Sequence, residues 1–276
     1  MDFALALASQ SIHPTISNGD DGWTLEVEEV EYEKAILTIE RYRVENRHWR
    51  GWNWQHHLHS SDLWFHSGSI FWCAAIVTLY YWNKVRYPQL EALGLMDSIA
   101  VHAGQWWRLF TAVTLHADIS HLAANASTGF LLLGIAMATY GPGFGIVGAY
   151  LAGAGGNLAA LWFYPEHHRS LGASGMVMGA LGLIAVQTLV HWKQNSASRT
   201  RLVVRSFAAA LSILILLGLS PNSDVVAHVG GFAFGCIFGC ALHLVPKWFR
   251  QNTTINQICV LLTLSWVIFT WWLSMK

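Results

Sequence analysis

The chain has 276 residues, of which 54% are hydrophobic and only 12% are charged. Soluble domains carry about 25% charged residues, so this composition excludes an ordinary soluble enzyme and indicates a protein that crosses a membrane several times. The formal net charge is zero, which argues against a nucleic-acid partner. The 15 tryptophans favour the same class, because Trp is enriched at membrane–water interfaces.

Residues 1–60 precede the first long apolar run and have the length of a small N-terminal domain. Their segment GWTLEVEEVEYEKAILTIERYRVENRHWR favours a hairpin or a strand followed by a helix, because it mixes alternation with charge. The next stretch, WRGWNWQHHLHSSDLWFH, predicts a collar at the membrane interface. We favour this collar over a metal site for its histidines, and the sequence predicts no metal or other cofactor.

Seven apolar runs follow, each close to the roughly 20 residues that a membrane span requires. They are 63–82, 119–140, 144–164, 171–192, 202–219, 225–245 and 255–273. The predicted fold is an all-α polytopic membrane helix bundle, with a six-helix core in residues 61–250 and an additional C-terminal transmembrane helix in residues 251–276.

The distribution of positive charge predicts the orientation of these spans. Of the 16 Lys and Arg residues, 11 lie on one side, in the N-terminal segment and around the loops that follow the fourth and sixth spans. Cytoplasmic loops carry an excess of Lys and Arg, so we expect the N-terminus to lie in the cytoplasm. We expect the membrane to be the cell (inner) membrane. Spans two, four and six then run from the outer side inwards.

Polar residues gather at the outer ends of these three spans. His116, His121 and Asn125 lie at the start of span two, Ser174 at the start of span four, and His228 at the start of span six. Each is within about one or two helical turns of the same end, at ~1.5 Å rise per residue. Ionisable groups inside a membrane are expensive and tend to be functional.

Small residues at four-residue spacing allow two of these helices to approach closely. Span four offers Gly175 and Gly179, and span six offers Gly231, Gly235 and Gly239. Such packing can bring a serine hydroxyl within the about 2.6–3.2 Å of an imidazole that proton transfer requires. A single serine in a span is usually a packing residue, but these groups at one depth favour the functional interpretation.

The donors that this chemistry needs are also present in the sequence. His121 and Asn125 are four residues apart and project from one helix face. Together with the Ser174 backbone N–H, they can form a pocket for the oxyanion that develops when a hydroxyl attacks a carbonyl.

These motifs resemble the rhomboid family of intramembrane serine proteases. The matching elements occur in the family's order: Trp107-Arg108 in the first outer loop, His116 with His121 and Asn125 in span two, Gly172-Ala173-Ser174-Gly175 in span four, and Ala227-His228 with Gly231 and Gly235 in span six. The first 60 residues and the last span match none of these motifs.

The resemblance implies an intramembrane serine endopeptidase that cuts transmembrane protein substrates in the lipid bilayer. Ser174 would be the nucleophile and His228 the general base, with the oxyanion held by His121, Asn125 and the Ser174 N–H. Gly172 would shape the loop before the serine, and His116 would support the cavity. The site would open to the extracytoplasmic side. Met178 departs from the family, which has an aromatic residue at that position.

Two other functions are compatible with parts of the sequence. One is a catalytically inactive rhomboid-like protein that binds membrane clients, although such relatives generally lack the serine or the histidine. The other is a polytopic transporter with the histidines in its path, although the two halves show no internal repeat. The sequence contains no basis for an oligomeric state.

Overall fold

The computed structural model describes residues 2–19, 22–46, 65–164, 167–192 and 224–276. The chain divides into two compact units, residues 1–61 and 62–276. The predicted span at 202–219 and most of the Trp- and His-rich collar lie outside the described residues.

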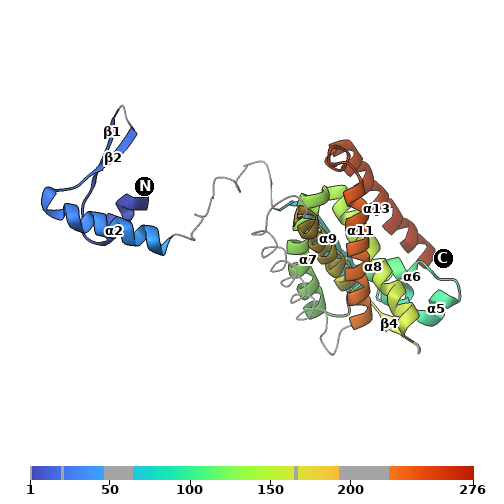
Figure 1. Cartoon of the computed structure of the whole chain (residues 1–276). Coiled ribbons are helices and arrows are strands. Elements are labelled where there is room, and N and C mark those ends of the chain that lie inside the picture. The colour runs from blue at the N-terminus through green and yellow to red at the C-terminus, as the bar shows by residue number, and fades with distance from the viewer. Residues whose placement is uncertain (1, 20–21, 47–64, 165–166, 193–223) are drawn as a thin grey trace. The chain divides into compact units, whose positions relative to one another are not determined.

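The first unit is a small α/β element (Figure 1). Its elements are α1 (Asp2–Ser9), β1 (Thr15–Gly19), β2 (Gly22–Glu26), a 3-10 turn (Glu29–Glu31) and α2 (Tyr32–Glu45). Strands β1 and β2 pair in antiparallel register, and Leu7, Ile12 and Ala35 form a small buried core. Of the two arrangements expected after residue 22, the structure has the strand followed by a helix.

The second unit is a helix bundle that includes two very short strands (Figure 1). Its elements before the site are α3 (Gly68–Val85), α4 (Gln89–Gly94), β3 (Met96–Asp97), α5 (Ser98–His102), α6 (Arg108–Thr111) and a 3-10 turn (Ala112–Thr114). Those that follow are α7 (Ile119–Tyr140), α8 (Pro142–Phe163), β4 (Arg169–Ser170), α9 (Ser174–Trp192), α11 (Val225–Leu244), α12 (Lys247–Arg250) and α13 (Thr253–Ser274).

Four described helices are long and apolar enough to cross a membrane, namely α7, α8, α11 and α13, and α9 contains a shorter apolar segment. The fold is therefore that of an integral, polytopic helical membrane protein. The number of seven spans remains a prediction. The helices at the first and fourth predicted spans, α3 and α9, are not among these four, and the predicted span at 202–219 lies outside the described residues.

Helix boundaries follow local sequence signals. Gly141 has φ +97° and ends α7, and Pro142 occupies the first turn of α8. Glycine past a helix end and proline at a helix start are both favoured, so the two helices join directly. Asn256 of α13 accepts a hydrogen bond from the Gly143 N–H at 2.8 Å and so holds this turn.

The fourth predicted span begins later than expected, at Ser174 rather than residue 171. Arg169 and Ser170 form strand β4 instead, which pairs antiparallel with β3. Gly172 has φ +138°, outside the helical region. The apolar residues just before the serine therefore belong to a loop, and Ser174 is the first residue of its helix.

Candidate active site

Helices α7, α8, α9 and α11 pack against one another, and the predicted site residues lie near the N-terminal ends of α7, α9 and α11. Aspartates cap two of these ends: Asp118 Oδ1 accepts the His121 N–H at 2.8 Å, and Asp224 Oδ1 accepts the Ala227 N–H at 3.0 Å. Such caps satisfy backbone donors that a helix start leaves free. Each cap lies within one turn of a candidate histidine.

The loop before Ser174 lies directly against α7. A β-carbon placed on Gly172 would lie 2.6 Å from His121 Cε1, 2.7 Å from His121 Nε2 and 3.7 Å from Asn125 Nδ2. Glycine is needed here both for its positive φ and for this close approach. The structure thus brings the His121 and Asn125 side chains together beside the loop that leads to the serine.

Asn125 and His116 have buried polar atoms that are not satisfied by the described part of the chain. Asn125 is buried and its Nδ2 makes no hydrogen bond to any described residue, and the same is true of both ring nitrogens of His116. The His116 ring lies 5.4 Å from the His121 ring, centroid to centroid. Buried polar groups are normally hydrogen-bonded, so these donors are candidates for binding water or a substrate oxygen.

Helices α9 and α11 approach each other through glycines. A β-carbon on Gly231 would collide with the backbone oxygen of Gly175, and one on Gly235 would collide with that of Gly179. Side chains are absent on both surfaces at these points, so the backbones are in contact. The contact begins one residue after Ser174 and three residues after His228.

The His228 side chain is buried, and Ser174 is partly exposed. Met178 is buried among the apolar residues of the bundle core. Ser174 and His228 thus lie next to the glycine contact in the chain, and His121 and Asn125 lie beside the loop that leads to Ser174.

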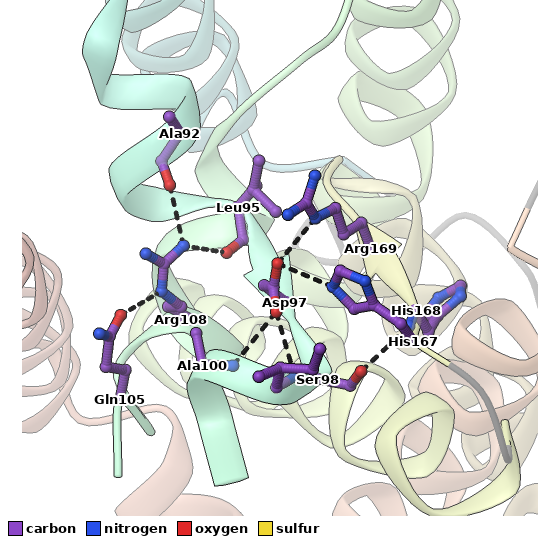
Figure 2. A network of polar contacts seen from close by, with 11 residues as sticks. Ala92, Leu95, Asp97, Ser98, Ala100, Gln105, Arg108, His167, His168 and Arg169 are labelled. Atoms are coloured by element: carbon purple, nitrogen blue, oxygen red, sulfur yellow. Dashed lines mark hydrogen bonds and ion pairs between the residues drawn. The ribbon is translucent and has the colours of Figure 1, made fainter. Parts of the chain in front are cut away.

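Trp107 and Arg108 have a separate position, in the loop between α3 and α7. Arg108 Nη1 donates to the carbonyl oxygens of Ala92 and Leu95, at 3.0 Å and 2.9 Å, and its Nε donates to Gln105 Oε1 (Figure 2). Trp107 begins α6 and its ring contacts Trp106. The contacts shown in Figure 2 for Arg108 all lie within this loop, so Arg108 holds the loop together.

Sequence reasoning missed Asp97, which connects this loop to β4. Figure 2 shows its carboxylate between the His167 and Arg169 side chains, with Oδ2 3.0 Å from His167 Nε2 and 2.7 Å from Arg169 Nε. Burial alone would raise the pKa of Asp97, but these hydrogen bonds hold its pKa well below the usual range. Asp97 could have been identified from sequence as a helix cap before Ser98, but not as the partner of residues about 70 positions away.

The C-terminal helix α13 packs against α8 and against the same outer loop. Trp271 Nε1 donates to Thr114 Oγ1 at 3.1 Å, and Ser274 Oγ donates to the Leu93 carbonyl at 2.9 Å. The last helix is thus part of the support of the loop that precedes α7.

Comparisons with known proteins agree with this architecture. A family model described as the rhomboid domain matches residues 103–245. The chain is 32% identical over 172 residues to RHOMBOID-like protein 1 of Arabidopsis thaliana, covering 60% of this chain and 42% of that protein. It is 30% identical over 163 residues to the rhomboid protease GluP of Bacillus subtilis, covering 57% of this chain and 30% of that protein.

The helical membrane fold and this match define the class as a polytopic rhomboid-type membrane protein. The chain belongs to the rhomboid family. The region that matches spans about half or less of the length of these two relatives.

Proposed function

We propose that this protein is an intramembrane serine endopeptidase that hydrolyses peptide bonds in or near transmembrane segments of other membrane proteins. The observation that carries the proposal is the buried Asn125 Nδ2, which has no hydrogen-bond partner among the described residues and lies beside His121 and the loop that leads to Ser174. The likeness to a rhomboid protease of Bacillus subtilis supports the same class of reaction.

In the proposed mechanism, Ser174 Oγ attacks the carbonyl carbon of the scissile peptide bond while its proton passes to the His228 ring. The carbonyl oxygen becomes an oxyanion and accepts hydrogen bonds from His121, Asn125 and the Ser174 N–H. When the tetrahedral intermediate collapses, the C–N bond breaks and the departing amine takes the proton from His228. Water then attacks the ester carbonyl, with His228 again accepting and returning a proton, and Ser174 is released.

The proposal uses a dyad rather than a triad. Asp224 precedes His228 by one turn, but its Oδ2 is 2.8 Å from His168 Nε2 and its Oδ1 accepts the Ala227 N–H. We therefore assign Asp224 no proton-transfer role. The N-terminal unit in the cytoplasm, an extracytoplasmic opening of the site and a location in the cell membrane are parts of this proposal.

The direct test is covalent labelling of the full chain in detergent or liposomes with a fluorophosphonate, which reacts with activated serines. The expected result is stoichiometric labelling of the wild-type protein and none of Ser174→Ala, with the label mapped to Ser174. Labelling of another residue, or equal labelling of both proteins, would contradict the assignment. Absence of labelling with binding of a transmembrane peptide intact would favour a catalytically inactive client-binding protein.

Removal of the proposed oxyanion donor is expected to reduce the rate without unfolding the protein. Asn125→Ala should lower kcat about 10²–10³-fold, as loss of one such donor does elsewhere. Its Nδ2 has no partner in the described part of the chain, so the variant loses no hydrogen bond of that group to a described residue. The measurement is cleavage of a fluorogenic transmembrane peptide together with thermal unfolding.

A matched control for this variant is Ser127→Ala, on the exposed face of the same helix, whose hydroxyl donates to the local Ala123 and Ala124 carbonyls. The control should retain the wild-type kcat. An Asn125→Ala protein with unchanged kcat would remove Asn125 from the mechanism.

A further inference from the structure

The four residues His167–Ser170 are called here the strap. They lead to α9 in the chain and contact two other parts of the fold. The strap precedes Ser174 in the chain, and its partners are the outer loop at Asp97 and Ser98 and the helix α11 at Asp224. No sequence motif discussed above includes it.

On one side, the strap is fixed to the outer loop. Besides the Asp97 contacts, the Ser98 N–H donates to the His168 carbonyl and the His168 N–H donates to Ser98 Oγ, both at 3.0 Å. Both directions of hydrogen bonding therefore hold the His168 backbone, and Figure 2 shows the one to Ser98 Oγ. Further along, the Gly172 N–H donates to the Ala112 carbonyl at 3.0 Å, so the chain is held almost as far as Ser174.

On the other side, a side-chain contact joins the strap to the start of α11. His168 Nε2 lies 2.8 Å from Asp224 Oδ2, and the His168 ring stacks on Tyr164 with centroids 4.2 Å apart. The Asp224 carbonyl accepts the His228 N–H at 3.0 Å. The contact therefore ties a residue six positions before Ser174 to a residue four positions before His228.

Near Ser174 and His228, the contact between α9 and α11 is made by glycines. Interlocking side-chain ridges normally fix how two helices are placed along their axes, but Gly175, Gly179, Gly231 and Gly235 have none to offer. A misplacement of about 1 Å at reacting groups can cost about 10²-fold in rate. A polar contact near the helix ends can restrict how α9 and α11 are placed along their axes.

We propose that His168 and Asp224 are positioning residues that hold His228 at the depth of Ser174. This inference rests on the proposed function, since it concerns the placement of the same serine and histidine. The His168–Asp224 contact sets the position of α11 along α9. The contacts with Asp97 and Ser98 hold His168 itself in place on the outer loop.

The test compares His168→Ala, His168→Gln and the wild-type full chain in liposomes. His168→Ala is expected to lower kcat about 10–10²-fold with KM changed less than about twofold, because substrate binding does not involve the contact. His168→Gln should recover most of the rate, because its amide can donate to Asp224. Thermal unfolding should differ little between the two variants.

The adjacent histidine is the matched control. His167→Ala removes one of two side-chain partners of Asp97 and leaves Arg169 in place, so kcat should fall less than about threefold by comparison with the effect at His168. Equal effects of the two alanine variants, a wild-type rate for His168→Ala, or a loss that glutamine does not restore would each overturn the inference.

The outcome is separable from that of the proposed function. If Ser174→Ala is inactive and His168→Ala retains full activity, only the positioning role fails. If Ser174→Ala cleaves as well as the wild type, the proposed function fails and the positioning role fails with it.

Discussion

Replacement of Ser174 by alanine is expected to reduce cleavage of a transmembrane peptide by about 10⁴-fold or more, the scale seen when a serine nucleophile is removed. His228→Ala should cost a similar factor, because the hydroxyl then has no base to accept its proton. The two residues act as one unit in the proposed mechanism. The double variant should therefore lose no more activity than either single variant.

The measurement is the initial cleavage rate of a fluorogenic transmembrane peptide by purified protein in liposomes, with thermal unfolding as the control for folding. Losses that simply multiply in the double variant would mean that the residues act independently. Equal rates for the wild type and both single variants would exclude the dyad and leave the inactive client-binding function.

Widening of the glycine contact is expected to have the second-largest effect. In Gly231→Ala the new β-carbon would collide with the Gly175 backbone oxygen, which cannot move without shifting α9. Overpacking of this kind costs about 1–3 kcal/mol, and a shift of about 1 Å between reacting groups lowers the rate about 10²-fold. Both the midpoint of thermal unfolding and kcat should therefore decrease.

Gly148→Ala provides a matched control within the same bundle. Its β-carbon would lie 3.3 Å from Leu183 Cδ1, the end of a flexible side chain that can yield. This variant should retain most of the activity. If Gly231→Ala were as stable and as active as Gly148→Ala, close backbone contact between α9 and α11 would not be required.

Much of the fold was predictable from hydrophobicity alone. The predicted span at 119–140 coincides with α7, and the runs at 225–245 and 255–273 correspond closely to α11 and α13. A membrane span must satisfy its backbone hydrogen bonds internally, so a sufficiently long apolar run has few alternatives to a helix. The start of α9 was placed too early, because hydropathy does not detect the strand pairing of β4 or the positive φ of Gly172.

The residues proposed for the site could be singled out in the sequence, because polar groups are rare at membrane depth and their shared depth is visible there. The structure adds the contact of His121 and Asn125 with Gly172, on which the oxyanion proposal depends. The roles of these residues remain proposals until the variants are measured.

By itself, the sequence determined the membrane class, most helix positions and the polar residues grouped near one end of the helices, because the bilayer constrains length, composition and depth. Only the tertiary structure decided that Asp97 binds His167 and Arg169, and that His168 binds Asp224. These pairs join segments 56 to 72 residues apart. Their contact depends on how the helices pack, and no local periodicity in the sequence records it.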